Sequence, residues 1–301
     1  MDSNYIQDSH GGETGVSEFW EYASLTERII NLWGYIADKY KDEPIIAGFD
    51  ILNEPCYVSD VDVFNDFYER VIRNIRDIDP YHILFLEGDD WAKDFSVFKN
   101  LGGEQQAISF HFYPGQHVYI TTESEARKVE LETKISYFTE LREITGYPLW
   151  VGEAGGHFPK DKLLDGLALI KDCLDLFEKH DISWTIWSYK DAGAMGLVYP
   201  KEDTKWMVMA NGFRYQWQVK GRSNPTIAKE IFEMLEGKYS YVIDKNLQEQ
   251  LKFRVFALLN ELHIHQLVKP KLQTIPWEEM KEYPKSFLLE NCGAGKNLLN
   301  L

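Results

Sequence analysis

The sequence is poor in cysteine and in basic residues, and it contains no long apolar run. Its three cysteines, Cys56, Cys173 and Cys292, are scattered and form no CxxC pair, so the sequence indicates neither a disulfide framework nor a zinc site. No apolar stretch approaches the roughly 18 residues of a membrane-spanning helix. The polar residues that follow Met1 also lack the pattern of a signal peptide.

The shortage of positive charge limits the possible partners. Lysine and arginine together number 32 against 48 aspartates and glutamates, and the net charge is -16. Proteins that bind nucleic acids or anionic membranes need clustered lysine and arginine, so we predict neither kind of partner. The sequence carries no signal for an oligomeric state.

The chain is rich in apolar and aromatic residues. Hydrophobic residues make up 44% of its 301 residues, and aromatic residues make up 14%. This length and composition suffice for one large core, and α/β barrels often reach this size as a single domain.

Apolar runs and amphipathic segments alternate along the first two thirds of the chain. The pattern predicts strands at 45–52, 82–88, 107–113, 148–153 and 183–190, and helices at 18–40, 61–78, 123–145 and 161–179. Such alternation is typical of βαβ units and a parallel sheet. Each predicted strand is followed by polar or aromatic residues, which fits the rim of a barrel better than an open sheet.

The alternation ends after Asp191. We predict a long loop at 192–224 and then helices at 225–235, 247–268 and 277–289. The composition does not change enough to mark a linker. We therefore divide the chain into a partial (β/α) barrel at 1–224, with the candidate catalytic residues, and C-terminal helices at 225–301 that pack on the barrel.

Two predicted strands end in a glutamate. Asn53, Glu54 and Pro55 follow the strand at 45–52, and Glu153 stands between glycines at the end of a later strand. A carboxylate at such a place costs free energy to desolvate unless it is paired or used, and barrel enzymes place catalytic groups there. We expect Glu54 and Glu153 to face each other across a cleft. Alternatively, Glu54 caps the following helix and Glu153 lies in a simple turn.

Four motifs in this order resemble glycoside hydrolase family 5, the cellulase-type β-glycanases of clan A. They are Asn53-Glu54-Pro55, His111-Phe112-Tyr113, Gly152-Glu153 and Trp187. Asn-Glu-Pro alone is a weak signal, but four motifs in sequence, each at a strand end, are specific. The resemblance covers roughly residues 1–200 and implies a (β/α)8 TIM barrel that degrades polysaccharide without a cofactor or metal.

The resemblance also implies a role for each matching residue. Glu54 looks like the acid/base of the reaction, and Glu153 like the nucleophile. Asn53 resembles the residue that holds the sugar 2-hydroxyl. His111 and Tyr113 resemble the pair that lines the cleft near the nucleophile.

The aromatic candidates and a few loop residues complete the predicted cleft. Trp187 resembles the platform under the reacting sugar, and Trp91 is a candidate for stacking on a distal sugar. For Trp187, Tyr113 and Trp91, ordinary core packing is the alternative. His111 could be a satisfied buried histidine, and Asn53 could be a turn residue. Further residues that could line the cleft are His117, Tyr119, Lys190 and Asp191. The segment 7–12, which includes His10, resembles the loop after the third barrel strand of the family.

The chemistry favours the same assignment. Hydrolysis that retains configuration needs one carboxyl group to protonate the leaving oxygen and another to attack the anomeric carbon, about 5–5.5 Å apart. Two carboxylates that close cannot both ionise freely, so one keeps its proton near neutral pH. Tyr113 can donate a hydrogen bond to charged Glu153 and keep its pKa low.

The strand count departs from the family pattern. If Glu54 ends the fourth strand, strands one to three are missing, because only a loop and one helix precede residue 45. We expect an incomplete barrel, with strands four to eight and a C-terminal helical extension. The chain could be a truncated product, another chain could supply the missing part, or the C-terminal helices could cover the gap.

The sequence therefore predicts a retaining hydrolase that acts on β-linked glucan or glucoside, either oligosaccharide or polysaccharide. An inactive truncated fragment or a carbohydrate-binding pseudo-enzyme is the alternative. A metal-dependent hydrolase that uses Asp89, Asp90, His111 and Glu153 is a third reading, against which stands the lack of an HxH motif. An extracellular location is implied if the full-length form resembles the family.

Overall fold

A computed structural model describes two compact units of the chain. The strand unit comprises Ser17–Leu197 with Gly295–Leu301, and the helical unit comprises Met1–Val16 with Val198–Ala294. The described residues are 18–56, 58, 60–99, 103–114, 124–156, 163–191, 195–220, 224–239, 255, 258, 262 and 264–294.

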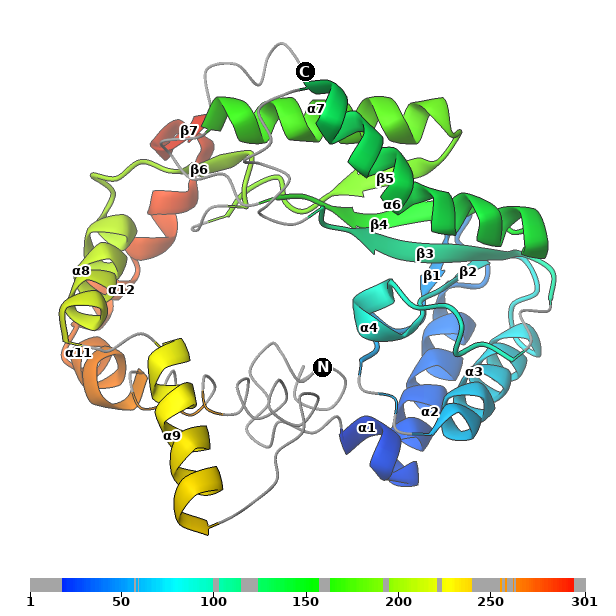
Figure 1. The fold of residues 1–301 in the computed structure, drawn as a ribbon, viewed down its shortest axis with the longest axis horizontal. Helices are drawn as coiled ribbons and strands as arrows, with labels where there is room; N and C mark the ends of the chain where they lie inside the picture. The colour runs from blue at the N-terminus through cyan, green and yellow to red at the C-terminus, as the bar shows by residue number, and fades with distance from the viewer. Residues whose placement is uncertain are drawn as a thin grey trace. The chain divides into compact units, whose positions relative to one another are not determined.

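The strand unit is built on a five-stranded parallel sheet (Figure 1). Its strands are β1 (Gly48–Asp50), β2 (Ile83–Leu86), β3 (Gln106–Phe112), β4 (Leu149–Ala154) and β5 (Ser183–Ile186). Each strand pairs in parallel with the next one along the chain. The sequence-based prediction of an α/β fold with five strands of a TIM-type barrel is therefore confirmed. The strands β1, β2 and β5 are shorter than predicted.

Helices connect most of these strands. They are α1 (Glu18–Glu21), α2 (Ala23–Tyr40), α3 (Val61–Arg76), the short α4 (Asp89–Ala92), α6 (Ser124–Thr145) and α7 (Leu163–Lys179). Asp60 begins α3 as its N-cap, since its side chain accepts a hydrogen bond from the backbone N–H of Asp62. Helix α2 packs along α3, and Trp33 of α2 contacts Phe49 of β1.

The core of the strand unit lies between β3 to β5 and the two helices α6 and α7 (Figure 1). Alternate residues of β3, Ile108 and Phe110, pack into it, and the ring of Phe110 stacks on that of Phe138 of α6 at 3.8 Å. Because side chains alternate along a strand, Ser109 and His111 point to the opposite face of the sheet. That opposite face carries the polar groups described below.

The helical unit corrects one prediction. Residues 192–224 were expected to form a loop, but helix α8 spans Lys205–Lys220. The prediction was wrong because the apolar residues of this segment do not follow a helical period and Gly212 interrupts them. The predicted helix at 225–235 is confirmed as α9 (Asn224–Tyr239).

Shorter elements complete the helical unit. A π-helical turn, η3 (Ile264–Val268), leads into α11 (Lys269–Gln273), and together they form the described end of the helix predicted at 247–268. The predicted helix at 277–289 is instead α12 (Trp277–Met280) followed by two 3₁₀ turns, η4 (Tyr283–Phe287) and η5 (Leu289–Asn291). An unpredicted antiparallel pair joins β6 (Val198–Pro200) to β7 (Cys292–Ala294).

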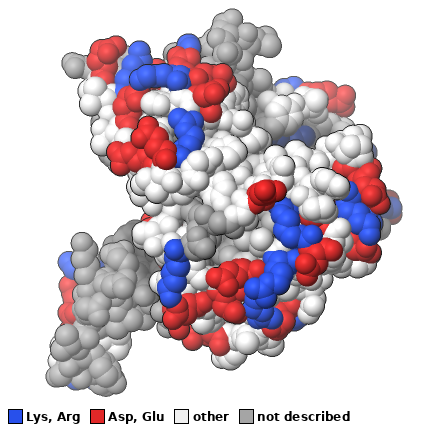
Figure 2. Space-filling model, turned by 90° about the vertical axis from the view of Figure 1, so that its right-hand side faces the viewer, with Lys and Arg blue, Asp and Glu red and all other residues white. Residues whose placement is uncertain are grey.

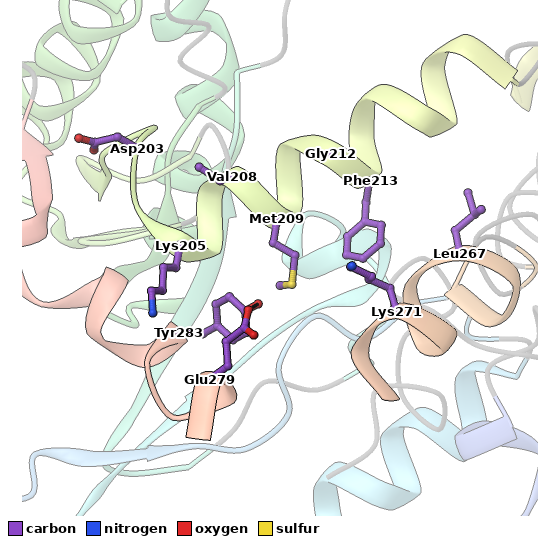
Figure 3. A pocket seen from close by; sticks show the side chains of 10 residues that line it. All are labelled: Asp203, Lys205, Val208, Met209, Gly212, Phe213, Leu267, Lys271, Glu279 and Tyr283. Atoms are coloured by element: carbon purple, nitrogen blue, oxygen red, sulfur yellow. Dashed lines mark hydrogen bonds between the residues drawn. The ribbon is translucent and has the colours of Figure 1, made fainter. Parts of the chain in front are cut away.

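Helix α8 packs against η4. The Trp206 ring contacts Phe287 at 5.6 Å, and its backbone N–H donates a hydrogen bond to Ser286. A cavity of about 590 Å³ lies beside this contact (Figure 3). Its lining includes Lys205, Met209, Phe213, Lys271, Glu279 and Tyr283. The Tyr283 hydroxyl donates a hydrogen bond to Glu279 there.

The surface of the described chain mixes both signs of charge. Acidic and basic side chains are interspersed over the face in Figure 2, and several form ion pairs, such as Arg70 with Glu27 and Lys99 with Asp62. Among the described residues, no helix has both the length and the apolar character needed to cross a membrane.

Candidate active site

Polar side chains gather where the strands β1 to β4 end. Because these neighbouring strands are parallel, their carboxyl ends meet at one edge of the sheet. Glu54 lies in the turn after β1, and Glu87 follows β2 directly. His111 and Tyr113 stand at the end of β3, and Glu153 stands near the end of β4. The sequence thus identified four of these five residues.

Glu54, His111 and Glu153 form the centre of this group. A carboxylate oxygen of each glutamate and a ring nitrogen of His111 all lie within 4.8 Å of one another. Nδ1 of His111 is 2.7 Å from Oε1 of Glu54 and 3.6 Å from Oε2 of Glu153. The two carboxylates therefore lie close together, as predicted.

Tyr113 contacts Glu153 as expected. Its hydroxyl donates a hydrogen bond of 2.6 Å to Oε2 of Glu153. Burial nevertheless raises the pKa of Glu153 above its ordinary value, although the Tyr113 hydrogen bond and His111 lower it. The prediction of a low pKa was wrong, because the desolvation of a largely buried carboxylate outweighs one hydrogen bond. The same environment raises the pKa of the Tyr113 hydroxyl, first through burial and then through Glu153.

His111 lies between carboxylates. Its side chain is 2% exposed, and Nε2 on its other side is 3.3 Å from Oε1 of Glu87. Burial alone lowers the pKa of His111, but the hydrogen bonds to Glu54 and Glu87 outweigh it and raise the pKa to about 10. At neutral pH the ring is therefore an imidazolium ion that donates from both nitrogens.

Three polar residues that adjoin Glu54 and His111 were not predicted as site residues. They are Glu87, Ser109 and Asp50. Glu87 accepts a hydrogen bond of 2.6 Å from the backbone N–H of Glu54. The Ser109 hydroxyl lies 3.2 Å from Glu87 and 3.1 Å from Asp50 of β1. A signal for Glu87 was present, since it follows an apolar strand just as Glu54 and Glu153 do. Nothing local in the sequence marks Asp50 or Ser109.

A glycine makes room for this network. A Cβ atom added at Gly152 would lie 2.8 Å from Oγ of Ser109 and 3.3 Å from Nε2 of His111. Both distances are shorter than ordinary van der Waals contact, so a side chain here would push Ser109 or His111 away. Gly152 therefore lets Ser109 and His111 approach the β4 backbone closely, which a residue with a side chain would prevent.

The structure describes three of the predicted sugar-contacting residues, Trp187, Asn53 and Trp91. Trp187 is 51% exposed, and its backbone N–H donates to the carbonyl of Ala154. Asn53 is exposed directly before Glu54. Trp91 of α4 donates its backbone N–H to the carbonyl of Pro55, after Glu54, while Lys93 covers its ring at 5.1 Å. His10, His117 and Tyr119 lie outside the described residues.

The donor set also bears on metal binding. Glu54, His111 and Glu153 are close enough to hold a cation. A histidine binds a metal through an unprotonated ring nitrogen, and both nitrogens of His111 are engaged with carboxylates while its pKa is about 10. A cation at this group would therefore compete with the protons of His111.

Comparison with known proteins identifies the family. The model of family 5 glycosyl hydrolases, described as cellulases, matches residues 7–193, and these include all the motifs named above. The chain belongs to glycoside hydrolase family 5. The family members most similar in sequence include a β-xylosidase of Phanerodontia chrysosporium, which is 32% identical over 312 aligned residues covering 93% of this chain.

Other members of the family are more distant. An endoglycoceramidase of Hydra vulgaris is 24% identical over 57% of this chain, and the endoglucanase MaCel5A of Microbulbifer sp. is 28% identical over 54%. The chain spans 65% of the length of the xylosidase, 33% of the endoglycoceramidase and 30% of MaCel5A. The sequence relatives with these names are all glycoside hydrolases.

Solved structures show the same fold. Thermotoga maritima Cel5A, determined in complex with mannotriose, superposes with a TM-score of 0.52 and 21% identity over 60% of this chain and 64% of its own. The cellulose synthase subunit Z of Clostridioides difficile gives a TM-score of 0.51 at 18% identity, over 57% of this chain and 62% of its own. The five strands of this family 5 chain are thus part of a TIM barrel.

Proposed function

We propose that this protein is a retaining β-glycoside hydrolase in which Glu153 is the nucleophile and Glu54 the acid/base. One observation carries the proposal: carboxylate oxygens of the two glutamates lie within 4.8 Å of each other at the carboxyl edge of a parallel sheet. A close pair of carboxyl groups suits direct attack by one of them, whereas an inverting mechanism needs about 6.5–9.5 Å between them to admit a water molecule.

The reaction would proceed in two displacements. The Glu153 carboxylate attacks the anomeric carbon while the glycosidic C–O bond breaks and Glu54 transfers its proton to the leaving oxygen. Water then attacks the same carbon, Glu54 accepts a proton from that water, and the ester bond to Glu153 breaks. Tyr113 supports the first step, because its hydrogen bond favours the charged form of Glu153.

The substrate is proposed to be a β-linked glucan or a shorter β-glucoside, bound with Asn53 near the sugar 2-hydroxyl and with Trp187 and Trp91 as stacking surfaces. The exposed ring of Trp187 supports this assignment, since an apolar sugar face can cover it. The 32% identity to a β-xylosidase favours β-xyloside as a second substrate class.

Hydrolysis of aryl β-glucoside and aryl β-xyloside tests the proposal. We expect turnover by the wild type and a loss of several orders of magnitude in Glu153→Gln, which keeps the shape of the side chain but removes the nucleophile. Glu104→Gln, which changes an exposed glutamate of the same unit, serves as the control. Equal glucan binding by the wild type and Glu153→Gln, without turnover by either, would instead select a carbohydrate-binding pseudo-enzyme.

A further inference from the structure

Glu87 is a buried carboxylate that the two displacements do not use. Its side chain is 1% exposed. A carboxylate so far from water persists only with strong partners, because desolvation of an unpaired charge is costly. Among the described residues its partners include the backbone of Glu54, the ring of His111 and the hydroxyl of Ser109.

The hydrogen bond from the Glu54 N–H to Glu87 holds the backbone of Glu54. Glu54 has a φ angle of 49°, in the left-handed region that residues other than glycine seldom adopt. Its N–H donates to Oε2 of Glu87 at 2.6 Å, and hydrogen bonds to a charged acceptor are stronger than neutral ones. Glu87 therefore holds the turn that aims the Glu54 side chain at the cleft.

The second contact holds His111. Oε1 of Glu87 faces Nε2 at 3.3 Å, while Nδ1 of the same ring faces Glu54 at 2.7 Å. A neutral imidazole has only one N–H, so when Glu54 and Glu87 are both ionised only the doubly protonated ring can donate to both. The negative charge of Glu87 thus keeps a proton on the nitrogen that faces Glu54.

We propose that Glu87 is a positioning residue, whose carboxylate fixes the backbone of Glu54 and keeps His111 a charged hydrogen-bond donor to the Glu54 side chain. The inference rests on the proposed function of Glu54. A fixed donor beside Glu54 stabilises the carboxylate that forms when this residue has given up its proton, and it holds that oxygen in place for the second displacement.

Asp50 is the natural control for this role. It shares the Ser109 hydroxyl with Glu87, and one hydroxyl proton can serve only one acceptor at a time. Desolvation and then repulsion from Glu87 raise the pKa of Asp50 well above its ordinary value. The Asp50→Asn variant therefore changes a neighbour of the Ser109 hydroxyl and leaves Glu87 itself in place.

The titratable groups around this network come from every neighbouring element. They are Asp50 of β1, Glu54 after β1, Tyr68 of α3, His111 of β3, Tyr113 after β3 and Glu153 of β4. Of these, Tyr68 donates to the backbone carbonyl of Glu87 rather than to its side chain. The charge of His111 is thus set by the three glutamates that face it.

The test compares Glu87→Gln, Asp50→Asn and the exposed control Glu104→Gln. Two measurements are made on each folded variant: kcat and KM for an aryl β-glycoside across pH, and the protonation of His111 by nitrogen NMR of its ring. For Glu87→Gln we expect kcat to fall roughly 10- to 100-fold with little change in KM, since Glu87 touches no substrate. We also expect His111 to lose its charge at neutral pH in this variant alone.

Two results would overturn the proposal. One is a folded Glu87→Gln variant with wild-type kcat and a charged His111. The other is a wild-type His111 that titrates near the ordinary value of about 6.5, which decides the matter even if Glu87→Gln does not fold. A wild type without turnover would refute the proposed function instead, and the NMR titration would still support or overturn the role of Glu87.

Discussion

Removal of one hydroxyl, in Tyr113→Phe, tests how the site controls its nucleophile. This hydroxyl donates a 2.6 Å hydrogen bond to Glu153, whose side chain is 18% exposed. A hydrogen bond to a charged group contributes about 1.5–3 kcal/mol, which corresponds to roughly a 10- to 150-fold change in rate. We expect kcat/KM of Tyr113→Phe to fall within this range.

The pH dependence of kcat/KM gives a more specific test of the Tyr113 hydrogen bond than the rate at one pH. Tyr113 stabilises the charged form of Glu153, so its loss raises the pKa of Glu153 further above the ordinary value. At a given pH a smaller fraction of the nucleophile is then ionised. The loss of kcat/KM should therefore grow as pH falls, and the acidic limb of the profile should move to higher pH.

The assay is the pH profile of kcat/KM for an aryl β-glycoside. Tyr147→Phe is the matched control, because the Tyr147 hydroxyl donates to the uncharged carbonyl of Gly103. We expect this control to keep the wild-type profile. An acidic limb that stays in place in Tyr113→Phe, or that moves equally in Tyr147→Phe, would refute the reasoning.

Two further predictions concern stability and metal. Phe110→Ala should lower the free energy of unfolding by about 3–5 kcal/mol in urea titration, because Phe110 is fully buried and stacks on Phe138. Val129→Ala, on the exposed side of α6, should change it by less than about 0.5 kcal/mol, and equal effects of the two would contradict the described core. A chelator should leave glycoside hydrolysis unchanged, because His111 presents protonated nitrogens; activity lost to the chelator and restored by a divalent cation would contradict this.

The sequence was sufficient to predict the fold class and to select Glu54, His111, Tyr113 and Glu153, which the structure brings together. Strand–helix alternation gave the parallel sheet, because the hydrophobic period of each element depends only on local geometry. The position of Glu54 and Glu153 after apolar strands placed both at one edge, because parallel strands share the direction of their ends. The same rule applied to β2 would also have selected Glu87.

The helical unit shows where local patterns fail. Helix α8 has apolar and aromatic residues on several sides, so no single period marks it, and its packing against η4 provides the stabilisation that the pattern does not reveal. The pairing of β6 with β7 joins residues more than 90 positions apart, which no local pattern can predict.

What the sequence determined by itself was the order of the five parallel strands and the residues that stand where these strands end. Only the tertiary structure decided the ionisation of the site, because it depends on distances between groups on different strands. Burial, not the Tyr113 hydrogen bond, sets the direction of the Glu153 pKa, and two carboxylates from different strands raise that of His111. Desolvation and Coulomb energy act through space, so residue types and spacings alone do not fix them.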